Sequence, residues 1–276
     1  QVSDGETLQE YLGSHIGEPI ENYGVGGYSV YQAYRRMRVV EATRPAKYIV
    51  LNIFNDDHFR NLDALRGRIR HGAVSPCSWT LPHLRVDPDT GTCEERDNLC
   101  PTVKALYGLT DLDVITELLE DDPILEMTLA LKNAEVESTD QNVPLLFGLR
   151  APDSPLAREL GERHVRAALF ATQKVVELFE AYTQATGKKL MVVLSHGRGI
   201  VKTRLLGKPD WDESLMSWLK RRPYPVIDFR DAHQEDYARW KPDPDTYLDQ
   251  YSIGHYAPAG NFFCAQAMKD DLVTWL

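Results

Sequence analysis

Long apolar segments are missing from this sequence, and so is an excess of basic charge. No run of residues approaches the ~20 apolar positions that a membrane-spanning helix needs, so we predict no membrane partner. Lysine and arginine together number 31 against 41 aspartates and glutamates, which gives a formal net charge of −10. Because phosphate binding favours a basic surface, nucleic acid is not an expected partner and anionic membranes are disfavoured.

Cysteine is sparse and is not spaced for a metal. The chain has four cysteines, Cys77, Cys93, Cys100 and Cys264, and no two of them form a C-x-x-C pair. We therefore predict no structural zinc site and no metal. The first three lie close enough together to permit a local disulfide. Free thiols in a cytosolic protein are the interpretation that we favour over a secreted, disulfide-bonded one.

What is present is an alternation of short apolar runs with helical patterns. Four runs predict strands: residues 19–25, 47–54, 190–195 and 224–229. Helical patterns cover residues 3–17, 28–42, 154–187 and 258–276. Two of the runs are apolar on both faces, as buried parallel strands are. The alternation predicts a three-layer α/β fold with a parallel sheet.

The chain of 276 residues, 43% of them hydrophobic, is long enough for one large domain with an insertion. Residues 67–153 are rich in turn residues, and we interpret them as that insertion within a single domain, 1–276. Residues 84–95 predict a hairpin with an Asp/Gly turn, and residues 111–133 one or two short helices. The insertion would form a lid or wall beside a pocket. Trp79 and His83 are candidate lining residues, with packing as the alternative for each.

Polar or glycine-rich segments follow the predicted strands, at 24–29, 55–58 and 195–199. In parallel α/β folds, ligands bind beyond the carboxyl ends of the strands. Each segment also has an ordinary structural interpretation. The glycines can make a turn, Asn55 and Asp56 can cap a helix, and Ser195 can do the same. A divalent cation at Asp56, Asp57 and His58 is a weaker alternative, because no partner ligands are spaced for it.

Three stretches occur in an order that resembles the SGNH (GDSL-type) hydrolases: NYGVGGYS at 22–29, VLNIFNDD at 50–57 and SIGHYAPAGN at 252–261. The resemblance implies a flavodoxin-like fold and serine catalysis on an ester, with no cofactor. It implies an oxyanion hole formed by the Gly27 N–H and the Asn55 side chain. His255 is implied as the general base, although a lone histidine is often a core residue.

These residue types suit acyl transfer. A main-chain N–H approaches a substrate closely where no Cβ intervenes, which favours glycine at position 27. The Asn55 carboxamide is a neutral donor that cannot lose its proton. A histidine of near-neutral pKa takes the proton of a serine and returns it to the leaving group.

The chain departs from the family pattern in two respects. The G-D-S block that bears the nucleophile is not found in these residues. We expect it in a segment that precedes residue 1, which would also complete the sheet by association. Ser195 is a candidate substitute nucleophile, although it lacks the G-x-S-x-G pattern.

The second departure concerns the triad acid, because the family aspartate is replaced here by Ser252. Asp249 and Asp245 are upstream candidates for its role, and a serine–histidine dyad is another. Arg198 is a candidate for binding a substrate carboxylate. The sequence thus predicts an esterase or acyltransferase acting on a small-molecule or carbohydrate ester. The alternative is a non-catalytic ligand-binding protein on the same fold; the oligomeric state is not indicated.

Overall fold

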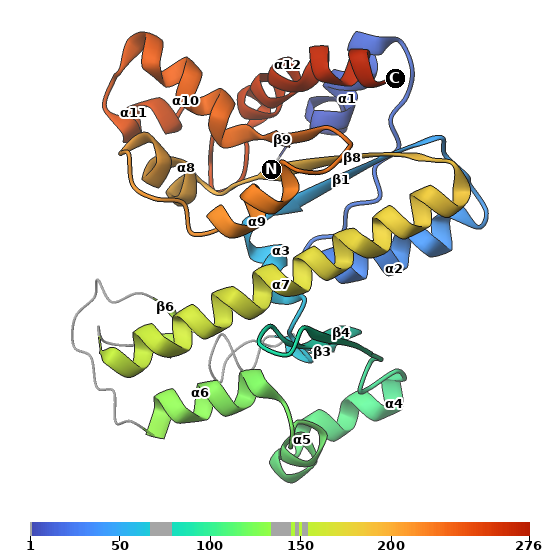
Figure 1. Ribbon diagram of the computed structural model, residues 1–276, viewed down its shortest axis with the longest axis vertical. Coiled ribbons are helices and arrows are strands. Elements are labelled where there is room, and N and C mark those ends of the chain that lie inside the picture. The colour runs from blue at the N-terminus through green and yellow to red at the C-terminus, as the bar shows by residue number, and fades with distance from the viewer. Residues whose placement is uncertain (1, 67–78, 134–144, 147–148, 151–153) are drawn as a thin grey trace. The chain divides into compact units, whose positions relative to one another are not determined.

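The computed structural model describes residues 2–66, 79–133, 145–146, 149–150 and 154–276 (Figure 1). Its residues form two compact units. The first comprises residues 1–26, 36–57 and 177–276, and the second comprises residues 27–35 and 58–176. Helices α2 (Val30–Glu41), α3 (Asn55–Arg60) and α7 (Pro155–Thr186) each continue from one unit into the other.

The first unit is built around a parallel sheet of three strands, in the order β1-β8-β9. These strands are β1 (Tyr48–Phe54), β8 (Lys189–Ser195) and β9 (Val226–Asp228). In the central strand, Val192, Val193 and Leu194 are all 0% exposed, as expected of a strand that is covered on both faces. The mixed α/β class and the parallel sheet are therefore confirmed.

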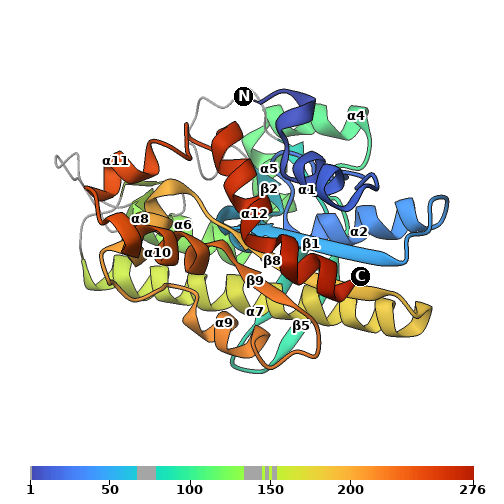
Figure 2. The ribbon, with the colours of Figure 1, turned by 90° about the horizontal axis from the view of Figure 1, so that it is seen from above.

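Helices α1 (Leu8–Ile16) and α12 (Pro258–Trp275) pack on one face of this sheet, as Figures 1 and 2 show. Their core is a cluster of buried residues, Leu12, Met191, Val193, Phe229, Cys264, Ala265, Met268 and Leu272. Gly17, with φ of 77°, ends α1 in the left-handed region. Cys264 is 1% exposed in this core, and burial raises the pKa of its thiol to about 12.

Four further α-helices belong to the first unit. They are α8 (Arg198–Leu205), α9 (Glu213–Leu219), α10 (Phe229–Trp240) and α11 (Pro244–Leu248). Helix α8 follows β8 directly and α10 follows β9 directly. The helices therefore begin where the strands end, so their first residues and the strand ends share one edge of the sheet.

The second unit contains three antiparallel strand pairs: β2 (Leu65–Arg66) with β3 (Trp79–Thr80), β4 (His83–Asp87) with β5 (Thr92–Arg96), and β6 (Leu145–Leu146) with β7 (Leu149–Arg150). Its short helices are α4 (Val103–Leu106), η3 (Tyr107–Thr110), α5 (Leu112–Leu118) and α6 (Pro123–Asn133). The hairpin predicted within 84–95 and the helices predicted within 111–133 are confirmed. Other parts of the interpreted insertion, Cys77 among them, lie outside the described residues.

The prediction of a strand at 19–25 is wrong, because these residues, all of them described, form no strand. The side chain of Asn22 offers the backbone a local alternative: its Oδ1 accepts a hydrogen bond from the Gly24 N–H at 2.8 Å. Such a turn competes with pairing to a strand. Among the described residues the parallel sheet consequently has three strands, one fewer than predicted.

Strand β1 is an edge strand of that sheet, within the part of the chain that the structure describes. Val50 and Asn52 lie opposite Met191 and Val193, and paired residues of neighbouring strands point to the same face. Met191 and Val193 are 0% exposed, whereas Val50 is 41% exposed. Helices α1 and α12 thus cover this face at β8 and leave it open at β1.

Candidate active site

The carboxyl ends of β1 and β8 bring two of the predicted segments together. Phe54 is paired with Ser195, so the residues that follow each strand meet at one edge of the sheet. There the Gly197 N–H donates a hydrogen bond of 2.8 Å to Asn55 Oδ1, and Asn55 Nδ2 donates one of 2.6 Å to Asp56 Oδ1. The carboxamide oxygen therefore faces Gly197, and its NH2 group points away from it.

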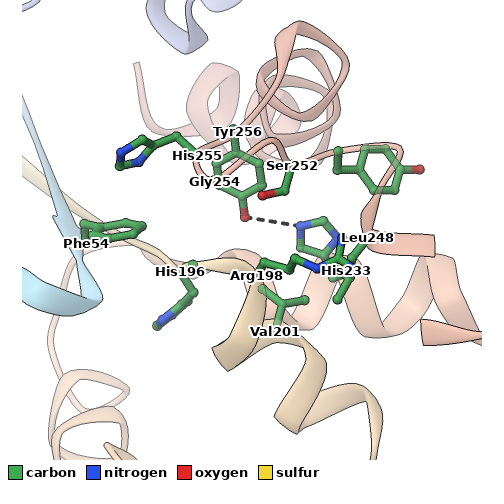
Figure 3. A pocket seen from close by; sticks show the side chains of 12 residues that line it. Phe54, His196, Arg198, Val201, His233, Leu248, Ser252, Gly254, His255 and Tyr256 are labelled. Carbon is green, nitrogen blue, oxygen red and sulfur yellow. Dashed lines mark hydrogen bonds between the residues drawn. The ribbon is translucent and has the colours of Figure 1, made fainter. Parts of the chain in front are cut away.

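A pocket lies beside this carboxamide in the first unit. Its lining includes Phe54, Gly197, Ser252 and His255. The rings of Phe54 and His255 lie with their centroids 5.9 Å apart, and Figure 3 shows both on the same side of the pocket. Asn55 follows Phe54 in the chain and is bonded to Gly197, so it is flanked by two lining residues. The structure thus brings the predicted base and the predicted side-chain donor into one neighbourhood.

His255 is exposed, and it is not a core histidine. It lies on a tight turn between α11 and α12, in which the Ile253 N–H donates to the His255 carbonyl at 2.9 Å. Gly254, with φ of 100°, occupies a conformation that other residues avoid. The turn is closed by the Ala257 N–H, which donates to the Tyr251 carbonyl at 2.8 Å. The His255 imidazole is thus accessible to a molecule bound in the pocket.

Tyr256, the next residue, is held from beneath by His233. The Tyr256 hydroxyl lies 3.2 Å from His233 Nε2 (Figure 3). On the other side of the ring, the Tyr247 hydroxyl lies 3.1 Å from His233 Nδ1. The rings of His233 and Tyr256 are stacked, with an interplanar angle of 6°. Burial lowers the pKa of His233 to about 4, so this imidazole is neutral at pH 7. Its part is therefore structural.

The candidate acids are engaged with basic side chains. Arg198 Nη2 contacts Asp245 Oδ1 at 2.8 Å, and Arg198 Nη1 forms an ion pair with Asp249. Lys202 Nζ contacts Asp245 Oδ2 at 2.5 Å, and the hydrogen bonds from Lys202 and Arg198 lower the pKa of Asp245. Asp245 and Asp249 thus neutralise a cationic pair. The same contacts occupy the Arg198 guanidinium that was a candidate for binding a substrate carboxylate.

The other candidates at the strand ends have structural contacts. Ser195 is buried, with Oγ 3.5 Å from the Ile53 carbonyl oxygen. Asp57 Oδ2 accepts a hydrogen bond of 3.0 Å from the Phe54 N–H, and His58 Nδ1 lies 2.9 Å from Thr172 Oγ1. Asp57 and His58 therefore turn to different partners. No cluster of three or more metal-ligating side chains occurs among the described residues.

Gly27 belongs to the second unit, whereas Asn55 and His255 belong to the first. It has φ of 80°, in the left-handed region, and lies in the turn before α2. Ser29 and Gln32 cap that helix reciprocally, with Ser29 N to Gln32 Oε1 at 2.9 Å and Gln32 N to Ser29 Oγ at 3.2 Å. The glycine is thus required by the turn whatever else its N–H does.

The two candidate wall residues also lie in the second unit. His83 is buried, its Nδ1 is 3.2 Å from the Leu81 carbonyl oxygen, and burial lowers its pKa. Trp79 is 37% exposed. His83 therefore serves in packing, which was the alternative to lining a pocket.

A buried ionic cluster beside the pocket was not foreseen from the sequence. His196 Nε2 lies 3.2 Å from Asp228 Oδ1, and Arg230 binds both Asp228 and Asp212, at 2.7 Å each. Burial alone would raise the pKa of Asp228, but the adjacent His196 and Arg230 outweigh it and hold that pKa far below its usual range. Figure 3 shows the His196 ring directed away from His255.

No protein-family model, curated protein or solved structure significantly matches this chain. No helix among the described residues combines the length and the apolar character that crossing a membrane requires.

Proposed function

We propose that this chain is an SGNH-type ester hydrolase or acyltransferase on a three-layer, flavodoxin-like fold. The observation that supports it most is the carboxamide of Asn55, oriented by the Gly197 N–H next to the pocket that His255 lines. A preorganised neutral donor beside an exposed imidazole is the pair of groups that acyl transfer from an ester needs. The proposal needs no cofactor and no metal.

The proposed reaction has two halves. A serine Oγ attacks the ester carbonyl carbon while His255 takes the hydroxyl proton, and the carbonyl oxygen becomes an oxyanion. Asn55 Nδ2–H would stabilise that oxyanion. Its collapse breaks the bond to the alcohol, which receives the proton from His255. Water, or a second alcohol in a transferase, then attacks the acyl-serine by the same route.

The serine would come from a segment outside residues 1–276. The open edge of β1 supports this part of the proposal, because an edge strand presents unpaired N–H and C=O groups to which another strand can add. The exposed Val50 and Asn52 would be covered by the same addition. In parallel pairing, the added strand would end beside Asn55, at the edge of the sheet that bears the pocket.

The proposed base acts without a triad aspartate. Ser252 occupies the position of the family acid and lines the same pocket as His255. Asp245 and Asp249 are committed to Arg198 and Lys202. We therefore propose a serine–histidine dyad, in which the fixed turn around Gly254 orients the imidazole instead.

A non-catalytic binding protein on the same fold is the second candidate. The pairing of both upstream aspartates with basic residues favours it, because ligand binding needs no acid behind His255. A measurement of ester hydrolysis distinguishes the two candidates, because only the hydrolase or acyltransferase would catalyse it.

The test is hydrolysis of p-nitrophenyl acetate by the complete chain as its gene encodes it. His255→Ala should abolish most of the activity, and Asn55→Ala should lower kcat by about 10²–10³. His15→Ala, which changes an exposed histidine of α1, is the matched control and should be neutral. An inactive parent protein would favour the binding protein.

A further inference from the structure

We infer that the main-chain N–H of Gly197 is a positioning group that sets the orientation of the Asn55 carboxamide. The inference rests on the proposed function, in which Asn55 Nδ2 faces the oxyanion. It starts from the register of the sheet, where Phe54 is paired with Ser195. That register brings the Gly197 nitrogen to 2.8 Å from Asn55 Oδ1, across two strands that are far apart in the sequence.

The N–H of Gly197 is available for this purpose because α8 does not use it. Gly197 is the N-cap of α8, and its carbonyl oxygen accepts from the Ile200 N–H at 3.0 Å and the Val201 N–H at 3.2 Å. An N-cap residue contributes its carbonyl to the helix, whereas its own N–H points away from it. Here that N–H points to Asn55.

An N–H donor distinguishes the two ends of a carboxamide. Only the oxygen of Asn55 accepts from Gly197, so the NH2 group must lie on the opposite side. A half-turn of the carboxamide would set two donors against each other and leave the N–H of Gly197 without its acceptor. The Gly197 N–H thus favours the orientation that the contact of Asn55 Nδ2 with Asp56 Oδ1, at 2.6 Å, favours as well, and the second hydrogen of the NH2 group is the one that can donate to an anion.

The residues on either side hold Gly197 in place. His196 is held by Asp228, at 3.2 Å, and Arg198 by Asp245, at 2.8 Å. The His196 and Asp228 side chains are 0% and 2% exposed, so this contact is closed to solvent. The donor is therefore flanked on both sides by residues whose side chains contact other elements of the first unit.

Glycine is not required at position 197 by its conformation. Its φ of −69° and ψ of 155° suit any residue, proline included. A Cβ added there would lie 3.4 Å from Asn55 Oδ1 and 3.5 Å from Phe54 Cζ, which is ordinary contact. Two substitutions therefore form a pair: Gly197→Ala keeps the N–H, whereas Gly197→Pro removes it at a compatible φ and puts the ring Cδ where the hydrogen was, which also displaces the Asn55 oxygen.

The first experiment measures kcat and KM of the complete encoded chain for p-nitrophenyl acetate. Gly197→Ala should stay within about threefold of the parent. Gly197→Pro should lower kcat about 10²-fold with little change in KM, because the contact to the developing oxyanion is lost. Adding Gly197→Pro to Asn55→Ala should cost nothing further, since both changes remove one interaction. Equal activity of the proline and alanine variants, or full additivity in the double variant, would overturn the inference.

The second experiment is independent of catalysis and of whether Gly197→Pro folds. It follows hydrogen exchange of the Gly197 amide by NMR in Asn55→Ala and Asn55→Asp. A carboxylate still accepts from Gly197 but has no NH2, so Asn55→Asp should keep the amide protected and Asn55→Ala should expose it. Unchanged exchange in Asn55→Ala would refute the positioning role. A protected amide together with an inactive parent protein would refute the proposed function alone.

Discussion

The buried cluster around Arg230 should dominate the stability of the first unit. The Arg230 side chain is 0% exposed, and its nitrogens lie 2.7 Å from both Asp212 Oδ1 and Asp228 Oδ2. Replacing it with methionine leaves these two buried carboxylates without their main partner. Breaking a buried ion pair in this way costs about 3–5 kcal/mol. At roughly 2–4 °C per kcal/mol, the melting temperature should fall by about 6–20 °C.

The assay for Arg230→Met is thermal unfolding followed by circular dichroism at several pH values. Asp228 has a depressed pKa in the folded protein, so its stabilising contribution is present above the unfolded pKa of about 3.9 and is lost as the pH falls below it. The gap between the parent and Arg230→Met should therefore narrow below about pH 4.

The control is Arg239→Met, which changes an exposed arginine of the same helix, α10. It should alter the unfolding free energy by less than about 0.5 kcal/mol. A cost for Arg230→Met that matches this control, or one that does not depend on pH, would refute the assignment of the cluster.

Three further predictions concern the surroundings of the His255 turn. Gly260→Ala places a Cβ 2.2 Å from the Tyr251 carbonyl oxygen, so it should destabilise by about 1–3 kcal/mol in chemical denaturation, whereas Gly5→Ala, with nothing within 4 Å, should not. His233 has a folded pKa of about 4, below its unfolded value, so stability should decrease by up to about 3 kcal/mol as the pH falls from about 6.5 to 4, and His233→Gln should flatten that decrease. Cys264, whose pKa is raised to about 12, should resist alkylation by iodoacetamide in the folded protein, as measured by mass spectrometry.

Each of these has an outcome that contradicts it. Equal unfolding free energies for the two glycine variants would show that the contact at Gly260 is relieved at no cost. A pH profile that is unchanged in His233→Gln would show that another group titrates there. Alkylation of native Cys264 at the rate found in denaturant would show that α12 does not bury it.

The regular elements of the first unit are predictable from local patterns, because their apolar residues recur with the period of the element. The run of apolar residues in β8 is an example. The prediction of a strand at 19–25 is wrong for a local reason: the Asn22 side chain accepts a hydrogen bond from Gly24, and the resulting turn replaces strand pairing. The period of the apolar residues does not show that a side-chain turn competes with strand pairing.

The candidate site was predictable only where a residue type identifies its chemistry. Asn55 and His255 can be chosen from the order of motifs; the structure places His255 in the pocket lining and Asn55 next to two lining residues, Phe54 and Gly197. Gly197 cannot, because its contribution is a main-chain N–H whose partner depends on the register of two distant strands. The pairing of His196 with Asp228 cannot be predicted from the sequence either, because a buried ionic contact between two elements leaves no spacing pattern in the sequence.

The central claim is that His255 activates a serine of this protein toward esters. The most direct measurement is covalent labelling of the complete encoded chain with diethyl p-nitrophenyl phosphate, with the modified residue located by mass spectrometry. We predict one labelled serine, labelling that is lost in His255→Ala, and labelling that is retained in His15→Ala. An unlabelled parent protein, or a serine labelled equally fast in His255→Ala, would contradict the account.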